Sequence, residues 1–396
     1  MPSALPFIVH LDADAFFVSV ELALQPQYRG KKVAVGGRER GIIASASYEA
    51  RACGVYTPMP TARALKVCPD LILLPHKGSY GETSRKMFDL CETLTPYVQR
   101  NSIDEGYLDL NPCGLKSAED IERVVRGLQK RIWDELQIPV SMGIATNKLV
   151  AQIASKLRKP RGFVVVLPGA EASFLEPLDI GKLPGVGNKT ETELQTRGIW
   201  KIRDLFTKTE RELEALLGRD WQSFLAMARG EDDRPVETEH EDAKSYSQQE
   251  TFSKDVGEFA AIERTAKGMI DALMPAIRAD GKRVRTITMK VRYGDFTQET
   301  AGKSLPEASD LEQPFYPLVP VLLKQAWSKQ RPLRLVSVRL SGVEDGARQL
   351  DMFAETDEKR RKLAAVLDQL NKGKVARVQH GHQLPPRSGG ARSSEE

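Results

Sequence analysis

The chain has 396 residues, 41% of them hydrophobic, and 58 Lys and Arg residues against 54 Asp and Glu residues give a formal net charge of +4. This length predicts more than one domain, and the small net charge means that any basic surface must come from local clustering. Because the sequence shows no signal-peptide pattern, no bilayer-length apolar stretch and no CxxC spacing, we exclude secreted and membrane-spanning classes and expect a cytoplasmic protein.

The first predicted element is a strand that begins near Phe7 and runs into Asp12 and Asp14, followed by the aromatic pair Phe16 and Phe17. A carboxylate at the end of a buried strand loses solvation, and this loss is costly unless the group is paired or bound to a metal. Asp12 is therefore a candidate metal ligand, whereas the aromatic pair taken alone fits an ordinary core.

Two strands, over 31–37 and 41–47, lead into a short helix that begins at Tyr48 and ends before Gly54. Tyr48 and Arg51 lie three residues apart and would share one helical face. A hydroxyl and a guanidinium together can bind a triphosphate, because arginine matches phosphate geometry with two parallel hydrogen bonds. The alternative is a surface arginine stacked on a tyrosine.

The next predicted elements are, in order, a helix over 80–97, a strand hairpin over 102–110, a helix over 118–136 and a strand over 140–145. With the first strand they make the order βαββαβ, which predicts a ferredoxin-like fold. If the first strand lies beside the hairpin, Asp12, Asp104 and Glu105 converge. Such oxygen ligands suit Mg²⁺ or Mn²⁺ rather than Zn²⁺, and a pair of such ions promotes attack on phosphorus. For Asp104 and Glu105 alone, a solvated acidic turn is the alternative.

Three segments, 12–17 (DADAFF), 47–51 (SYEAR) and 102–105 (SIDE), closely resemble the signature motifs of the Y family of DNA polymerases. The resemblance extends from about Phe7 to Gly342 and implies a bacterial translesion polymerase that adds deoxynucleotides to a primer 3′ end with low fidelity. It implies two Mg²⁺ ions, for which Mn²⁺ can substitute, held by Asp12, the carbonyl of Ala13, Asp104 and Glu105. It places the incoming nucleotide against Phe16, Phe17, Tyr48, Arg51 and Lys159, with Phe17 as a steric gate against ribonucleotides.

Beyond these segments, the glycine-flanked turn at 183–189 resembles a helix-hairpin-helix motif, whose backbone N–H groups grip DNA without reading its sequence. A plain turn between helices is the alternative. An acidic linker then precedes a second βαββαβ series, in which a strand over 282–292 alternates cationic and apolar residues and presents a basic face. The predicted DNA-contact residues are Gly185, Gly187, Lys189, Arg283, Arg285, Lys290 and Arg292.

The last motif resembles the peptide by which bacterial proteins bind the sliding clamp, and it consists of Gln349, Leu350, Asp351, Met352 and Phe353. Its apolar side chains have no evident burial site within a finished βαββαβ domain, which favours a partner site. Packing of the peptide back onto that domain is the alternative. We expect a basic helix capped at Thr356 to follow, and disorder after Gly381.

We therefore predict an α+β protein with the multidomain architecture of a right-hand polymerase: a ferredoxin-like palm, small fingers, a helical thumb and a βαββαβ little finger. The predicted boundaries are 1–10 and 77–167 for the palm, 11–76 for the fingers, 168–232 for the thumb, 233–244 for a linker, 245–343 for the little finger and 344–396 for a flexible tail. The expected partners are primer-template DNA, deoxynucleoside triphosphates and the sliding clamp, with no membrane contact and a monomeric state.

Two rival functions remain open at this point. A nucleotide cyclase also places paired acids on a ferredoxin-like palm, but that function does not explain the DNA-gripping turn or the second basic sheet. A polymerase-like accessory protein without catalysis would bind DNA, but the intact Asp12, Asp104 and Glu105 argue against it.

Overall fold

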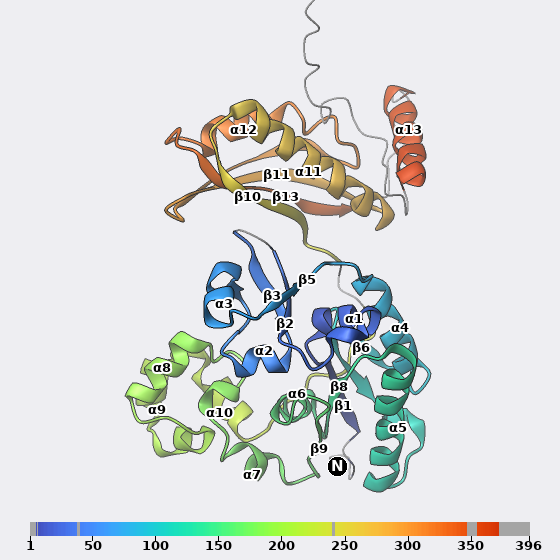
Figure 1. The fold of residues 1–396 in the computed structure, drawn as a ribbon, viewed down its shortest axis with the longest axis vertical. Helices are drawn as coiled ribbons and strands as arrows, with labels where there is room; N and C mark the ends of the chain where they lie inside the picture. Colours follow the sequence, from blue (N-terminus) through green and yellow to red (C-terminus); the bar gives the residue numbers. More distant parts are fainter. Residues whose placement is uncertain (1–4, 6, 38–39, 240–241, 347–354, 372–396) are drawn as a thin grey trace, which may run out of the picture. The chain divides into compact units, whose positions relative to one another are not determined.

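The structure is a computed structural model that describes residues 5, 7–37, 40–239, 242–346 and 355–371. Contacts divide the chain into two compact units, Met1–His240 and Glu241–Glu396 (Figure 1). The first unit holds the segments predicted as palm, fingers and thumb, and the second holds those predicted as little finger and tail. No helix in the described ranges is long and apolar enough to cross a membrane.

A five-stranded sheet in the order β6-β7-β1-β8-β9 forms the centre of the first unit. Its strands are β1 (Ile8–Ala13), β6 (Val98–Arg100), β7 (Glu105–Asp109), β8 (Val140–Ala145) and β9 (Phe163–Val165). In chain order, β1, β6, β7 and β8 combine with helices α4 (Tyr80–Glu92) and α5 (Ala118–Leu136) as β1-α4-β6-β7-α5-β8, which is the predicted βαββαβ order. Since β1 lies between β7 and β8, the ferredoxin-like prediction is confirmed.

Two boundaries in this region differ from the prediction. Strand β1 continues to Ala13, so the palm sheet includes residues that the boundary at 10 assigned to the fingers. Helix α4 ends at Glu92 rather than at 97. Pro96 lies between the end of α4 and the start of β6, and proline cannot continue a helix because it lacks the backbone N–H.

The two faces of β1 have different neighbours, because successive side chains of a strand point to opposite sides of the sheet. Val9, Leu11 and Ala13 join the hydrophobic core that includes residues of α4 and α5. His10 instead contacts Ser155 of helix α6 (Lys148–Leu157), on the opposite face. Asp12 has the same parity as His10, so the polar residues of β1 face α6.

The fingers segment forms a small sheet in the order β4-β3-β2-β5, preceded by helix α1 (Phe16–Leu24). Its elements are β2 (Val33–Gly36), β3 (Ile42–Ala46), α2 (Tyr48–Ala52), β4 (Met59–Pro60), α3 (Thr61–Val67) and β5 (Ile72–Leu74). The Ser47 side chain accepts a hydrogen bond from the N–H of Ala50 and caps α2. Gly54 follows the helix with a φ of 89°, a conformation that favours glycine, as the sequence indicated.

The thumb consists of short helices whose core is continuous with α6. They are α7 (Glu171–Leu175), α8 (Asn188–Thr196), α9 (Glu210–Leu217) and α10 (Trp221–Ala228). The chain that leaves α10 lies along the palm: Asp232 accepts a hydrogen bond from the N–H of Leu149 at 2.9 Å, and the buried Lys148 ammonium donates to the carbonyl of Pro235 at 2.9 Å. The start of the predicted linker is therefore attached to the first unit.

The second unit contains a four-stranded sheet in the order β10-β13-β11-β12. Its elements are β10 (Ser245–Val256), α11 (Phe259–Ala279), β11 (Lys282–Tyr293), β12 (Gln298–Ser309), α12 (Leu318–Ala326) and β13 (Leu333–Asp345). This is the predicted βαββαβ order, and both helices pack on one face of the sheet, as Figure 1 shows. The strand order differs from that of the palm, because here the last strand, β13, lies between β10 and β11, whereas in the palm the first strand, β1, lies between β7 and β8.

Helix α13 (Glu355–Asn371) packs against the second unit through charged side chains. The Arg278 guanidinium donates to both carboxylate oxygens of Asp368, at 2.7 and 2.9 Å, and to Glu312 at 2.8 Å. Arg361 donates to Asp310 at 3.0 Å. The prediction of a flexible tail over 344–396 is therefore wrong for 355–371, where the expected basic helix is docked.

We expect Arg278→Ala to lower the free energy of unfolding of the second unit by about 3 kcal/mol. The substitution removes the cation of a largely buried ion-pair cluster and leaves the carboxylates of Glu312 and Asp368 without it. Arg331→Ala is the matched control, since its pair with Asp295 is exposed and should contribute under about 1 kcal/mol. Urea unfolding of both variants measures the difference. Equal losses would contradict the docking role of Arg278.

Candidate active site

The three predicted acids lie at one end of the palm sheet. Asp12 of β1 is the Cα partner of Glu105 of β7, and the N–H of Ala13 donates to the backbone carbonyl of Asp104 at 2.8 Å. Asp12 is buried, while Asp104 and Glu105 are half-buried. The sheet therefore brings together residues that are about ninety positions apart in the sequence, as the strand argument predicted.

Each acid has a polar or cationic partner in this structure. The Lys159 ammonium contacts the Asp12 carboxylate, Lys156 lies 3.2 Å from Glu105, and the Ser102 hydroxyl donates to Asp104 at 2.6 Å. Within the described ranges, no group of three Asp, Glu, His or Cys side chains is placed so that it could hold a metal ion. The available donors are carboxylate oxygens, which fit Mg²⁺ or Mn²⁺ in kind, but here Asp12 and Glu105 contact lysines and Asp104 contacts Ser102.

The electrostatics of the two strand-paired acids differ. Burial raises the pKa of Asp12 above its ordinary value, against the opposing effect of Lys159. Burial also acts to raise the pKa of Glu105, but the charge of the nearby Lys156 and the hydrogen bonds from Lys156 and Asn101 act in the opposite direction, and the pKa lies below the ordinary value. Two carboxylates so close together hold their charge only beside positive charge. The site therefore demands cations, which the two lysines supply in this structure.

Asp14, to which the sequence analysis gave no role, organises the surroundings of the acids. Its side chain is fully buried and accepts hydrogen bonds from the Ser141 hydroxyl at 2.9 Å, the Arg161 N–H at 2.7 Å and the Tyr48 hydroxyl at 3.2 Å. The sequence signal that could have identified Asp14 was its position two residues after Asp12. Asp14 connects the palm to helix α2 of the fingers.

Tyr48 and Arg51 lie together, as their spacing predicted. The Arg51 guanidinium stacks over the Tyr48 ring at 4.8 Å, and its Nε donates to the carbonyl of Ala46 at 2.9 Å. Burial and the adjacent Asp14 raise the pKa of Tyr48, so its hydroxyl keeps its proton and remains a donor. The arginine is therefore stacked on the tyrosine, as the alternative interpretation predicted. The Tyr48 hydroxyl is also hydrogen-bonded to Asp14, which lies beside the acidic cluster.

The aromatic pair separates into a core residue and a partly exposed one. Ala15 has a φ of 47° and turns the chain from β1 into α1. Phe16 is buried in the palm core, as the core alternative predicted, whereas Phe17 is half-buried. The Phe17 ring centroid lies 4.7 Å from that of Tyr80, whose hydroxyl donates to Glu21 at 2.8 Å. Packing against Tyr80 therefore fixes the position of Phe17.

His10 is a second residue that sequence reasoning missed. It is fully buried beside the acids, with Nδ1 2.8 Å from the Ser155 hydroxyl and its ring edge-on to Tyr107. Burial lowers the pKa of His10 to about 3, so the imidazole is neutral near pH 7. Its Nε2 lies 3.7 Å from the Glu105 carboxylate and has no hydrogen-bond partner among the described residues.

The thumb turn has the geometry that the glycines predicted. Gly185 has a φ of 88°, which requires glycine, and Gly187 is the N-cap of α8. Because the cap is an exposed glycine, no side chain of the cap accepts hydrogen bonds from the N–H groups in the first turn of α8. Lys189, in the same turn, is also exposed. A single 3₁₀ turn, Ile180–Lys182, precedes the loop.

Beyond a register shift between Val284 and Thr286, the basic strand of the second unit alternates as predicted. Met289 and Val291 are buried against the helices, and Lys290 and Arg292 lie on the other face of the sheet. Arg339 of β13 is exposed on that same face, because its Cα partner Thr288 has the parity of Lys290. Arg339 was missed, since strand pairing is needed to place it there.

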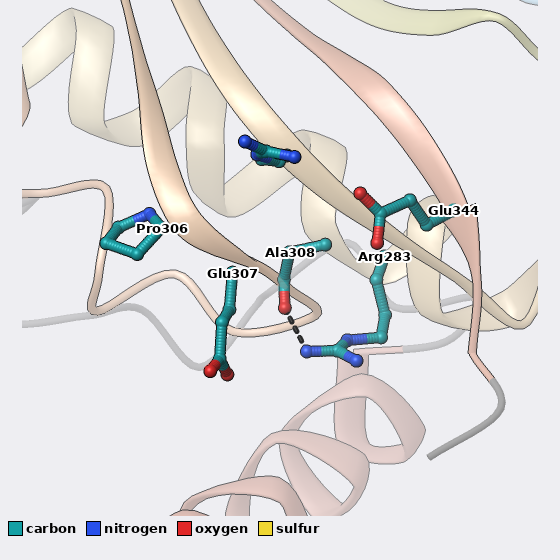
Figure 2. A pocket seen from close by; sticks show the side chains of 6 residues that line it. Arg283, Pro306, Glu307, Ala308 and Glu344 are labelled. Carbon is teal, nitrogen blue, oxygen red and sulfur yellow. Dashed lines mark hydrogen bonds between the residues drawn. The ribbon is translucent and has the colours of Figure 1, made fainter. Parts of the chain in front are cut away.

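Arg283 and Arg285 line a pocket of about 220 Å³ at one end of this strand. Figure 2 shows the Arg283 guanidinium reaching the carbonyl of Ala308, to which it donates a hydrogen bond. Glu307 and Glu344 line the same pocket, so its charge is mixed. The predicted clamp peptide, Gln349, Leu350, Asp351, Met352 and Phe353, lies outside the described residues.

Family models and known proteins together match almost the whole length of the chain. Residues 11–156 match the impB/mucB/samB family, residues 168–199 match the IMS family HHH motif, and residues 243–352 match the impB/mucB/samB family C-terminal domain. The chain is 69% identical over 390 residues to the DNA polymerase IV of Opitutus terrae, covering 97% of this chain and 100% of that protein. It is 38% identical over 370 residues to the DNA polymerase IV of Desulfatibacillum aliphaticivorans, covering 91% and 92%.

Solved structures agree with these relatives. The Y-family DNA polymerase chimera Dbh-Dpo4(243-245)-Dbh matches with a TM-score of 0.77 and 28% identity, covering 85% of this chain and 99% of that one. The insertion ternary complex of Dbh DNA polymerase matches with a TM-score of 0.61 and 28% identity, covering 85% and 99%. The right-hand architecture of palm, fingers, thumb and little finger is therefore confirmed.

Proposed function

The chain belongs to the Y family of DNA polymerases, of the bacterial DNA polymerase IV type, and from this premise we propose how its residues perform template-directed translesion synthesis. The proposed reaction is attack of a primer 3′-hydroxyl on the α-phosphorus of a deoxynucleoside triphosphate, assisted by two metal ions. The observation that carries this proposal is the placement of Asp12, Asp104 and Glu105 at one end of the palm sheet.

DNA polymerases of this family need divalent metal ions. We assign two Mg²⁺ ions, which Mn²⁺ can replace, to the carboxylates of Asp12, Asp104 and Glu105 and the carbonyl of Ala13. Such ions lower the pKa of an attacking hydroxyl and stabilise the charge of the triphosphate. The chain itself supports this assignment through oxygen donors of the right kind and through acids whose charges require nearby cations.

The nucleotide's triphosphate is assigned to Tyr48, Arg51 and Lys159. Arg51 is exposed and can present two parallel N–H groups to a phosphate. Tyr48 keeps a protonated hydroxyl, which donates to Asp14 in this structure and would turn to a phosphate oxygen when a nucleotide binds. Lys159 contacts Asp12 in this structure and would exchange that carboxylate for a phosphate oxygen when a nucleotide binds. The half-buried Phe17 is assigned the steric gate, while the buried Phe16 supports the gate from the core.

DNA binding is assigned to backbone contacts in two places. The Gly185–Gly187 turn and Lys189 would meet one strand at the N-terminus of α8. Arg285, Lys290 and Arg292, joined by Arg339, would meet phosphates from the open face of the little finger sheet, with Arg283 at its edge. Such contacts carry no sequence information, so affinity should fall steeply with salt and depend little on sequence.

Low fidelity follows from the same account. Among the described residues, the helices and strands before α13 form the palm, the fingers, the thumb and the little finger, and we find no separate proofreading domain there. Errors would then be limited only by nucleotide selection at one site. We also assign the chain to the cytoplasm, as a monomer.

Single-turnover insertion of one deoxynucleotide, titrated with Mg²⁺, tests the metal assignment. The account predicts no product in the presence of a chelator and recovery with Mg²⁺ or Mn²⁺ but not with Ca²⁺ alone, because Ca²⁺ favours longer bonds and looser coordination. Product formation at full rate without divalent ions would contradict it.

We propose that residues 349–353 bind the sliding clamp. Replacing Gln349, Leu350 and Phe353 with alanine should leave single-nucleotide insertion unchanged and abolish the stimulation of long primer extension by the clamp, because tethering raises the local concentration of enzyme at the primer without a new active-site contact. Extension of a primed circular template, with and without the clamp, measures this. Equal stimulation of variant and wild type would refute the assignment, and a loss of thermal stability with unchanged stimulation would favour packing onto the little finger.

A further inference from the structure

Three side chains from three different elements form a row that ends at one of the proposed metal ligands, Glu105. Ser155 of α6 and His10 of β1 are both at most 1% exposed, and Glu105 of β7 follows them. The Ser155 hydroxyl lies 2.8 Å from His10 Nδ1, and His10 Nε2 lies 3.7 Å from the Glu105 carboxylate. Nothing in the proposed reaction uses His10 or Ser155, so their arrangement needs its own explanation.

The position of the imidazole proton follows from the surroundings of His10. A neutral imidazole carries one N–H, so one nitrogen donates and the other accepts. With the proton on Nδ1, the buried lone pair of Nε2 would face the Glu105 carboxylate, an acceptor against an acceptor, at the cost of an unsatisfied buried group. With the proton on Nε2, the N–H dipole and the carboxylate make a favourable electrostatic contact at 3.7 Å, which is too long for a direct hydrogen bond, and Nδ1 accepts from Ser155.

The Ser155 hydroxyl is able to make this bond. It also lies 2.8 Å from the carbonyl of Gln152. That carbonyl is inside α6, where the helical N–H ladder supplies it with a donor. Turning the hydroxyl toward His10 therefore leaves the Gln152 carbonyl with its helical donor, whereas the other arrangement sets the Nε2 lone pair against the Glu105 carboxylate.

We propose that Ser155 and His10 are positioning residues that orient the Glu105 carboxylate, through a hydrogen bond from the Ser155 hydroxyl to Nδ1 and an electrostatic contact between Nε2–H and Glu105. This inference rests on the proposed function, in which Glu105 holds a metal ion. The other oxygen of Glu105 accepts from Asn101 at 3.2 Å, so the carboxylate would be held from both sides. Carboxylates that bind metals are commonly hydrogen-bonded in this way, and loss of such partners typically costs about 10–100-fold in metal affinity.

The direct test is the tautomer of His10 in the metal-free chain. Long-range ¹H–¹⁵N correlation spectra of the ¹⁵N-labelled full chain should show the proton on Nε2, and the His10 signals should move in Glu105→Gln and in Ser155→Ala. A proton on Nδ1, or signals that neither substitution shifts, would overturn the proposal. This readout requires neither metal nor activity, so it judges the inference separately from the proposed function.

Metal affinity gives the second readout, measured as the Mn²⁺ dissociation constant by electron paramagnetic resonance in the complex with primer-template and nucleotide. His10→Phe should weaken Mn²⁺ binding by about tenfold or more. His10→Gln, whose amide N–H₂ can still donate toward Glu105, should restore most of the affinity. Unchanged affinity in His10→Phe would overturn the proposal, whereas absence of Mn²⁺ binding by the wild type would refute the metal assignment instead.

A core variant separates positioning from loss of stability. Leu128→Ala removes a buried side chain of α5 that packs on the opposite face of the palm sheet from His10. Its thermal unfolding temperature should fall, with Mn²⁺ affinity near that of the wild type. If Leu128→Ala weakened Mn²⁺ binding as much as His10→Phe does, the effect of His10 would be a general loss of stability and the proposal would fail.

Discussion

Replacing Asp104 with alanine is expected to slow single-nucleotide insertion by at least about a thousandfold, which corresponds to about 4 kcal/mol of lost transition-state stabilisation. The reason is that the substitution removes one of the oxygen ligands assigned to the metal ions, and these ions would supply most of the charge stabilisation for phosphoryl transfer. Rapid-quench insertion with saturating nucleotide measures the loss. DNA affinity should be retained, because the assigned DNA contacts lie in the thumb and the little finger.

Asp109→Asn is the matched control for this prediction. Asp109 ends the same strand, β7, at the opposite end from Glu105, and its carboxylate accepts a hydrogen bond from the N–H of Asn111. Insertion by this variant should stay near the wild-type rate. Near-normal insertion by Asp104→Ala, or equal losses in both variants, would contradict the two-metal assignment.

Phe17→Ala is expected to raise the relative use of ribonucleotides by roughly a hundredfold, as removal of a 2–3 kcal/mol steric penalty would do. The half-buried Phe17 ring is fixed by Tyr80, so it cannot easily yield to a 2′-hydroxyl. Deoxynucleotide insertion should remain within about tenfold of the wild type. The ratio of kcat/KM for a deoxynucleotide and the matching ribonucleotide measures selection.

Tyr80→Phe serves as the control for the gate, since it keeps the ring against Phe17 and removes only the hydroxyl that donates to Glu21. Its sugar selection should match that of the wild type. If Phe17→Ala still rejects ribonucleotides as strongly as the wild type, the gate lies at another residue.

Local sequence signals predicted the elements with strong periodicity and clear ends. Helix α5 has the predicted bounds, because the Ser117 side chain accepts a hydrogen bond from the N–H of Asp120 and acidic residues occupy the first turn. Strand β8 also has its predicted bounds. The convergence of Asp12 with Glu105 could be predicted as well, since the βαββαβ order places the first strand beside the hairpin.

Contacts between distant segments could not be predicted in this way. His10 and Ser155 are 145 residues apart, and neither spacing nor composition connects them. The contact of Lys159 with Asp12 depends on the path of the chain after α6. In the second unit, the strand order and the docking of α13 depend on pairing and on the buried Arg278 cluster rather than on local periodicity.

Template-directed incorporation by the unaltered chain tests the central claim most directly. A labelled primer is annealed to four templates that differ only in the next base, and each deoxynucleotide is offered alone with Mg²⁺. The account predicts that the preferred nucleotide follows the template base in all four cases, with frequent errors and with no product from Asp104→Ala. Incorporation that ignores the template, cyclic nucleotide formation in place of extension, or DNA binding without incorporation would contradict it.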